Sequence, residues 1–558
     1  MELMESLVFK GYLPENLPPA FFAGDIGDFI VDDSGPEWWS KSQKPVRPAS
    51  YNASKRGITR RVFSVVHPVT MRDLAKFVAM HWDAITSFFS QIDCSLSVPG
   101  VAAEGDRAIE ISTHAAVDAA KITRLSRYRF IAKTDISRFY HSIYTHSLPW
   151  AFHGKLAAKA DRKFGSERIY FNRADHILRC GQDGQSIGIP VGPDTSRVFA
   201  EIVATAIDVE FKKRCEVSDV TIIRYVDDVW LGAHTHADAE RALSRYREAI
   251  REFELDINEA KTRIYSTDFR FADAWPADLS IALETALASA ARYRPERLRA
   301  ALERAFAMAV ADNDDGILKY VIRYLDRHSS GWSHWAICEP FLKRSVVHFG
   351  HTADYVARVI VWRYLVKRDL DVETWSKILA AVIDTHGRLG NDSEVCWATY
   401  ACAQLGAKID LGAAQNIIRN CGALAVVSVL NCVDKGLVDQ SIFDEAYERM
   451  SLETANGPFW PVLMEWKSRK WPRHDKLKVN NDVIGALAEK EARIFDLAKL
   501  PLVFGEVKEE SFDEVEMAIE PRSSVYDDDA SDVRDSEDDE EHDDYDEFAI
   551  DDEEGDDF

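Results

Sequence analysis

The stretch RYVDDVW, residues 224–230, places two adjacent carboxylates inside an apolar, β-prone run of the chain. This pattern predicts a β-hairpin that turns at Asp227 and Asp228. Burying two neighbouring negative charges is costly unless positive charge compensates them, so the run demands a cationic partner. A lone pair of aspartates in a turn is more often solvated, but the β-branched and aromatic neighbours on both sides weaken that interpretation here.

A divalent metal ion suits such carboxylates, and a third carboxylate should come from a neighbouring strand. Asp135 supplies it, because it lies at the end of the predicted strand FIAKTDI. Side chains alternate along a strand, so Asp227 and Asp228 face opposite ways unless the turn redirects one of them. We expect Asp227 to bind metal beside Asp135, with Asp228 as the weaker or more distant ligand. Two Mg²⁺ ions roughly 3.5–4 Å apart would activate an attacking hydroxyl and stabilise a leaving group, and Mn²⁺ could replace them.

Between residues 51 and 275, predicted strands alternate with predicted helices. Residues 196–214 form a helical pattern that Asp194 or Thr195 can cap, and residues 237–255 form a second amphipathic helix. The order strand, helix, hairpin, helix, strand predicts an α/β (α+β) domain with a split βαβ arrangement of the ferredoxin-like kind.

Four segments of this region resemble, in order, the palm motifs of reverse transcriptases. They are the segment around Asp135, GQSIGIPVGPDTSR at 184–197, YVDD at 225–228 and LDINEAKT at 255–262. Upstream, residues 55–85 resemble the fingers of bacterial reverse transcriptases. A single motif of this kind is a moderate signal, whereas four in order are specific. The resemblance implies a reverse-transcriptase fingers and palm domain over residues 51–275, with dNTP substrates and two Mg²⁺ ions.

The resemblance also implies roles for single residues of the palm. Ile136 joins the metal and nucleotide ligands, and Tyr140, beside Phe139, would lie under the sugar and exclude a 2′-hydroxyl. Tyr140 can also be a core aromatic residue, and both interpretations can hold together. Lys261 matches a basic residue near the leaving pyrophosphate, where it would donate a proton or stabilise charge; the alternative is a surface lysine.

Further nucleotide contacts are implied for the loop, the hairpin and the fingers. Gly192 and Pro193 lie in a loop whose backbone can approach a template base or an incoming nucleotide, and Tyr225 begins the YVDD motif. The alternative for the loop is an ordinary strand-to-helix connection. Arg60 and Arg61 could hold the triphosphate, or make surface contacts only.

Three further regions flank this domain. Residues 1–50 are predicted to be an extended N-terminal arm with short helices, and residues 276–505 an all-α domain of stacked, HEAT-like helix pairs without a fixed period. Residues 506–558 hold 27 acidic and three basic residues, so the remaining chain is close to neutral despite the net charge of −25. This segment is predicted to be a disordered acidic tail that either solubilises the protein or shields a basic channel.

Within the reverse transcriptases, three segments resemble the abortive-infection and defence-associated bacterial enzymes: residues 11–22, 149–155 and 391–410. That resemblance implies a role in antiphage defence and a homo-oligomer that makes DNA without a conventional template, primed from a protein tyrosine. Tyr12 and Tyr51 lie near the arm, and either could instead be a packing residue. The alternatives are a templated enzyme that uses a dedicated non-coding RNA, and a catalytically silent scaffold that binds nucleic acid.

The composition also bears on where the protein works. The eight cysteines contain no CxxC pair, which favours reduced thiols over a zinc site or a disulfide framework. No run of 18 apolar residues occurs, and the N-terminus lacks a signal-peptide pattern. We therefore expect a bacterial cytoplasmic protein without a membrane partner.

Overall fold

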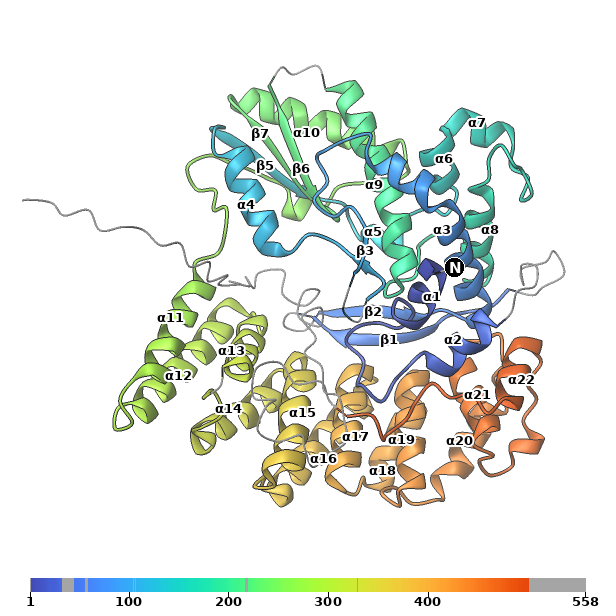
Figure 1. The fold of residues 1–558 in the computed structure, drawn as a ribbon, viewed down its shortest axis with the longest axis vertical. Helices are drawn as coiled ribbons and strands as arrows, with labels where there is room; N and C mark the ends of the chain where they lie inside the picture. Colours follow the sequence, from blue (N-terminus) through green and yellow to red (C-terminus); the bar gives the residue numbers. More distant parts are fainter. Residues whose placement is uncertain are drawn as a thin grey trace, which may run out of the picture.

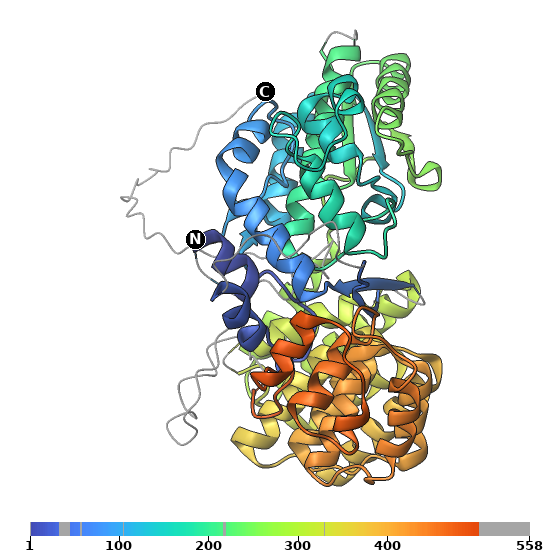
Figure 2. The same ribbon diagram turned by 90° about the vertical axis from the view of Figure 1, so that its right-hand side faces the viewer.

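The computed structural model describes residues 2–32, 45–55, 59–103, 105, 107–215, 219–328 and 330–500. It has two parts that lie on either side of one β-hairpin (Figure 1). The first part contains a four-stranded sheet and its helices, and the second is an arc of helices that runs from α11 to α22. The view turned by 90° shows the same division (Figure 2). The predicted acidic tail, residues 506–558, lies outside the described residues.

The four-stranded sheet has the strand order β6-β7-β5-β8, and all its neighbours are antiparallel. Its strands are β5 (Phe130–Asp135), β6 (Thr221–Tyr225), β7 (Asp228–Ala233) and β8 (Arg263–Tyr265). Helix α9 (Asp194–Arg214) follows β5, and α10 (His236–Arg251) follows β7. This connectivity and strand order confirm the split βαβ arrangement that the sequence predicts.

Alternation along the strands divides the sheet between two hydrophobic clusters. Ala132, Val229 and Leu231 join the main core on the face that α9 and α10 cover. Ile131 and Trp230 face the other way, into a small cluster with helix α4 (His114–Leu125). Asp135 and Asp228 share the strand parity of Ile131 and Trp230, so they project from the α4 side of the sheet.

The predicted cap of helix α9 is wrong. Pro193 occupies the N-cap position, and neither Asp194 nor Thr195 caps the helix with its side chain. The Asp194 carboxylate instead accepts hydrogen bonds from the backbone N–H groups of Ala108 and Ile109, at 3.0 and 3.1 Å, and pairs with Arg107. The Asp194 carboxylate therefore binds a buried arginine and two backbone N–H groups outside the helix. For this reason it does not cap the first turn of α9.

The rest of the first part surrounds this sheet. Its short helices and strands are α1 (Glu2–Phe9), α2 (Gly24–Val31), β1 (Ala49–Ser54), β2 (Arg60–Val65), α3 (Pro68–Phe89), β3 (Gly100–Val101), β4 (Ile109–Glu110), α5 (Phe139–Ser142), α6 (Ser147–His153), α7 (Lys155–Ala160) and α8 (Asn172–Cys180). The described part of the arm thus contains two short helices, as the sequence predicts. Strands β1 and β2 form an antiparallel hairpin.

In its described residues, the second part consists of helices and the loops that connect them. Its helices are α11 (Trp275–Ala288), α12 (Arg294–Asp312), α13 (Gly316–Arg327), α14 (Trp335–His348), α15 (Ala353–Trp362), α16 (Val372–Leu389), α17 (Asp392–Leu405), α18 (Leu411–Asn420), α19 (Ala423–Asp434), α20 (Ile442–Met450), α21 (Trp460–Ser468) and α22 (Asp482–Glu489). Helix α16 packs on α17 and α18, α17 on α19, and α18 on α20. Successive helices therefore stack in two layers; their HEAT-like classification stays a prediction. None of the described helices is long and apolar enough to cross a membrane.

The hairpin β1–β2 joins the two parts. On one side, the Ser64 N–H donates to the Val191 carbonyl, at 2.7 Å, in the loop that precedes α9. On the other side, the hairpin packs on α17 and α19. The arm adds a second connection, because the Asn16 carbonyl accepts a hydrogen bond from the Trp397 indole of α17 at 2.9 Å. The helical part is thus fixed to the hairpin and to the arm, and the hairpin in turn is fixed to the loop that precedes α9.

Candidate active site

The three predicted metal-binding aspartates meet at one end of the palm sheet. Asp135 is the last residue of β5, and its partner across the ladder is Asp228, the first residue of β7. Directly opposed residues in an antiparallel pair have Cβ atoms about 4.5–5.5 Å apart. Asp227 lies in the turn, where its carbonyl accepts a hydrogen bond from the Ile136 N–H at 3.1 Å. The register therefore places Asp228 opposite Asp135, with Asp227 adjacent; which of the two binds metal more firmly stays a prediction.

Burial raises the pKa of two of the carboxylates. Burial first, and then the charges of Asp228 and Asp135, raise the pKa of Asp227 to about 6. Burial also raises the pKa of Asp228, although Lys133 and Lys261 oppose the shift. Burial, together with repulsion at Asp227, thus exceeds the compensation that the nearby lysines provide.

Lys261 is the closest cation to this cluster. Its ammonium donates to Asp135 Oδ2 at 2.5 Å from a short 3₁₀ helix, Glu259–Lys261, that follows α10. Burial lowers the pKa of Lys261, but the hydrogen bond to Asp135 and the charges of the aspartates outweigh this effect and raise it. The lysine is therefore charged at neutral pH, and most of its side chain is exposed.

The donor set fits a divalent cation. Asp135 Oδ1 is buried and has no hydrogen-bond partner among the described residues, and two carboxylates with raised pKa lie beside it. A hard cation would satisfy all three groups. No group of three His, Cys, Asp or Glu side chains in the described ranges converges closely enough in this structure to hold a metal ion. Lys261 occupies Asp135 Oδ2 and leaves Oδ1 as the oxygen that a cation could reach.

The loop between Gly188 and Pro193 lies against the predicted nucleotide residues. Gly188 and Gly192 have positive φ angles of 84° and 125°. A Cβ atom at Gly192 would lie 3.2 Å from the Ser64 carbonyl oxygen of β2, and one at Gly188 would lie 3.2 Å from the His141 carbonyl oxygen. Glycine is therefore required at both positions, because the loop passes between fingers and palm at close range.

The predicted sugar-contacting residues lie beside this loop. Phe139 is buried in the main core, whereas Tyr140 is partly exposed and contacts that core. The Tyr140 carbonyl accepts a hydrogen bond from the Ile189 N–H at 2.8 Å, which joins the two segments. Tyr140 is thus a packing residue whose ring centroid lies 5.8 Å from that of Phe139, and its contact with a sugar stays a prediction. Ile136 is buried directly after Asp135, so only its backbone could reach a ligand.

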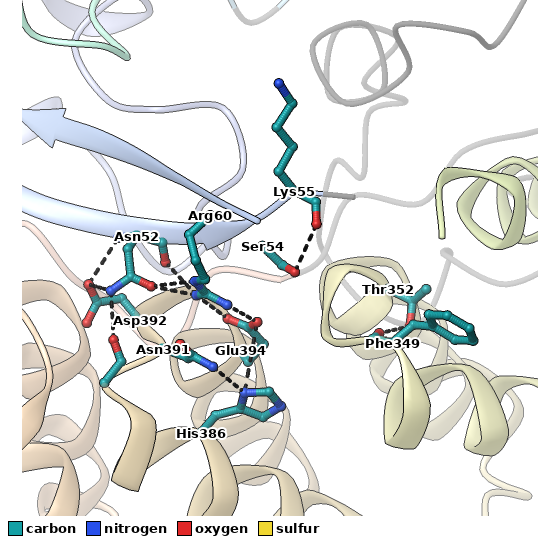
Figure 3. A network of polar contacts seen from close by, with 11 residues as sticks. Asn52, Ser54, Lys55, Arg60, Phe349, Thr352, His386, Asn391, Asp392 and Glu394 are labelled. Atoms are coloured by element: carbon teal, nitrogen blue, oxygen red, sulfur yellow. Dashed lines mark hydrogen bonds and ion pairs between the residues drawn. The ribbon is translucent and has the colours of Figure 1, made fainter. Parts of the chain in front are cut away.

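The two predicted triphosphate ligands lie on opposite faces of the hairpin. Arg60 forms a bidentate ion pair with Glu394 of α17, at 2.6 and 2.8 Å, and also bonds Asn52 (Figure 3). Arg61, next along β2, lies toward the palm, where burial first and then Arg138 and Arg61 lower the pKa of His141. Alternation therefore separates an arginine bound to the helical part from one beside the nucleotide residues.

Sequence reasoning missed the polar network beneath the aspartate turn. Arg224 is buried and pairs with Glu201 and Asp208 of α9, at 2.6 and 2.7 Å. Ser97 bonds both Glu201 and the turn residue Val226. Arg224 stands in the quoted RYVDDVW stretch, but nothing in the sequence signals its distant partners.

Tyr225, also beside the turn, packs its ring edge-on against His114 of α4, with centroids 5.2 Å apart.

No curated protein matches the sequence. Telomerase from Candida albicans, solved with the TWJ fragment of telomeric RNA, aligns at 10% identity and a TM-score of 0.29 over 60% of this chain and 64% of its own. Apo telomerase from Candida Tropicalis aligns at 10% identity and 0.31 over 76% and 71%; a form truncated from the C-terminal domain aligns at 14% and 0.26 over 41% and 52%. This chain thus spans less than two thirds of the first and third of these structures.

Family assignment rests on the sequence match. Residues 55–274 match the family described as "Reverse transcriptase (RNA-dependent DNA polymerase)". The matched range contains the sheet, the aspartate turn, the glycine loop and Lys261. The chain therefore contains a reverse transcriptase domain, the catalytic module of an RNA-directed DNA polymerase.

Proposed function

We propose that this enzyme makes DNA by two-metal nucleotidyl transfer at Asp135, Asp227 and Asp228. The observation that carries the proposal is a buried, unpartnered oxygen of Asp135 beside two carboxylates whose pKa is raised. Divalent cations bound there would activate the attacking hydroxyl and neutralise the leaving pyrophosphate. Reverse transcriptase domains use such ions in general, typically Mg²⁺, with Mn²⁺ as the alternative.

The chain's own residues supply position and charge for this reaction. Asp135 and Asp227 would hold the metal ions that align the reacting phosphate and hydroxyl, and Asp228 would add charge from the opposite strand. Lys261, whose ammonium donates to Asp135 Oδ2, would offer a proton to the departing pyrophosphate. In this structure the same ammonium compensates the charge of Asp135.

The nucleotide would lie between Tyr140, the glycine loop and Arg61. Tyr140 would exclude a 2′-hydroxyl, and the backbone of Gly192 and Pro193 would approach the base, with Tyr225 close to the primer end. Arg61 is the better triphosphate ligand of the two arginines, because Glu394 already binds Arg60. Arg60 would act indirectly, by holding the hairpin that presents Arg61.

We further propose antiphage defence as the biological role, with untemplated, protein-primed synthesis in a homo-oligomer. The support is the resemblance of residues 11–22, 149–155 and 391–410 to abortive-infection enzymes. The priming tyrosine is not Tyr12 or Tyr51 in the described conformation. Both are fully buried, and their hydroxyls donate to the carbonyls of Val66 and Asn16.

The experiment that tests this proposal incubates the purified protein with Mg²⁺ and labelled dNTPs, without template or primer. Asp227→Asn serves as the inactive control, and products are resolved before and after protease digestion. Long products that shift with protease and vanish in the control are expected.

Two other outcomes would select the alternatives. Synthesis only after RNA and a primer are added would identify a templated enzyme that uses a dedicated RNA. Nucleic-acid binding without synthesis under either condition would identify a silent scaffold.

A further inference from the structure

The turn that carries Asp227 has an unfavourable backbone conformation. Val226 has a φ of 53°, in the left-handed region. A β-branched residue rarely adopts this conformation, because its Cβ approaches the neighbouring carbonyl. Contacts outside the turn must therefore hold it.

Both backbone polar groups of Val226 are bound by side chains. Its N–H donates to Ser97 Oγ at 2.8 Å, and its carbonyl accepts from Arg224 Nη1 at 3.1 Å. The Ser97 hydroxyl in turn donates to Glu201 Oε2 at 3.1 Å. One serine hydroxyl thus connects the turn to a buried carboxylate of α9, using its donor and its acceptor at once.

Ser97 is itself fixed by the backbone of β6. The Arg224 N–H donates to the Cys94 carbonyl at 2.9 Å, and the Leu96 N–H donates to the Arg224 carbonyl at 2.8 Å. The segment from Cys94 to Ser97 therefore runs along the outer edge of the sheet. Ser97 itself is 2% exposed.

We propose that Ser97 is a positioning residue for the polymerase reaction: it holds Val226 in the left-handed conformation and so orients Asp227 toward Asp135. The inference rests on the proposed function. One buried hydrogen bond and the cost of a left-handed valine are of similar size, so losing the Ser97 hydroxyl lets the turn relax. Asp227 then rotates away from the other metal ligands.

Ser95 provides a matched control. Its hydroxyl donates to Glu201 Oε1 at 2.7 Å, so it touches the same buried carboxylate as Ser97. The Val226 N–H, however, bonds Ser97. Substituting either serine by alanine removes one bond to Glu201. Ser95→Ala also removes the acceptor of the Ser97 N–H, at 3.2 Å, whereas only Ser97→Ala removes the acceptor of the Val226 N–H.

The experiment compares Ser97→Ala and Ser95→Ala in the full-length chain. It measures Mn²⁺ binding by electron paramagnetic resonance, kcat and KM for dNTP, and the melting temperature. Ser97→Ala should weaken Mn²⁺ binding and lower kcat by about tenfold each, with KM within about twofold of the wild-type value. Ser95→Ala should stay within about twofold in every quantity, and the two melting temperatures should agree. Equal Mn²⁺ affinities in the two variants would overturn the role of Ser97.

A second variant tests the conformational explanation. Glycine adopts a positive φ without penalty, so Ser97→Ala/Val226→Gly should regain most of the lost Mn²⁺ affinity. A double variant as weak as Ser97→Ala would contradict the proposal. Failure of the proposed function shows separately, as a wild-type protein that makes no DNA under any condition, and the Mn²⁺ comparison still decides the role of Ser97 in that case.

Discussion

The aspartate cluster of the palm and the carboxylates of helix α17 are both buried, yet their partners differ. Asp392 accepts hydrogen bonds from the backbone and side chain of Asn52, both at 3.0 Å, and from the Gly422 N–H at 2.7 Å. Glu394 is held by both nitrogens of the Arg60 fork. Asp135, in contrast, has one largely exposed lysine and an oxygen without a partner among the described residues.

This difference distinguishes a structural acid from a functional one. Burial raises the pKa of Asp392 to about 6, as it does for Asp227, so the pKa alone does not separate the two clusters. The partners do: the carboxylates of Asp392 and Glu394 accept hydrogen bonds from Asn52, Gly422 and Arg60, whereas Asp135 Oδ1 has no partner among the described residues and lies beside two other acids. The buried acids of α17 have hydrogen-bond donors, whereas those of the palm lie close together with fewer donors. This difference indicates that the palm acids form a site for a cation.

Neutralising one palm acid should therefore abolish activity without loss of stability, the largest effect we expect. Asp227→Asn removes a metal ligand, so dNTP incorporation should fall by about 10³-fold or more. It also removes repulsion from Asp228 and Asp135, so the melting temperature without metal should hold or rise. Incorporation assays and thermal unfolding in EDTA check both. An Asp227→Asn variant that retains a tenth of the wild-type activity would contradict the distinction between the palm acids and those of α17.

The elements of the palm could be predicted from sequence because their signals are local. Alternating apolar residues predicted β5 and the hairpin, and the helical period predicted α9 and α10; their order then left few topologies. The partners of Asp194 and Arg60 could not be predicted, because Arg107 and Glu394 reach them from distant segments. Alternation implied that Arg60 and Arg61 face opposite ways, but not which face meets the helical part.

The reverse experiment applies to α17. Asp392→Ala leaves three donors of Asn52 and Gly422 without their acceptor, so unfolding free energy should fall by about 2–4 kcal/mol. Asp384→Ala is the matched control: this half-exposed acid pairs with Arg388 one turn away on α16, and its loss should cost about 0.5 kcal/mol or less. Denaturant unfolding measures both. Equal losses would mean that Asp392 is not structurally needed.

The two hairpin arginines sharpen the comparison within one strand. Arg60→Ala removes the arginine partner of the buried Glu394, and should lower the unfolding free energy by about 2 kcal/mol while KM for dNTP stays within about twofold. Arg61→Ala should do the opposite, with KM raised about tenfold and stability nearly unchanged. Steady-state kinetics and thermal unfolding of both variants provide the measurement. An increase in KM for dNTP in Arg60→Ala alone would show that Arg60, and not Arg61, binds the triphosphate.

The smallest expected effect is on the pH dependence of stability. Metal should change the contribution of Asp227 in the palm but not that of Asp392 in α17. Burial raises the pKa of Asp227 and of Asp392 in the folded protein to about 6, above the ordinary value of 3.8. Between these values the folded protein binds more protons than the unfolded chain, so stability without metal falls as pH rises from about 4 to 6.

Metal binding needs the deprotonated form of Asp227, so stabilisation by Mg²⁺ should grow across the same window. At ten times the dissociation constant it would reach about 1.4 kcal/mol, equivalent to a shift of a few degrees at most in the melting temperature. Thermal unfolding at pH 5 and pH 7, with Mg²⁺ and with EDTA, measures this difference. Asp227→Asn should lose the Mg²⁺ effect, whereas Asp392→Asn should keep it, because the amide at 392 lies outside the metal site. A Mg²⁺ effect of equal size at both pH values in the wild-type protein would show that the palm acids do not titrate as a metal-binding group.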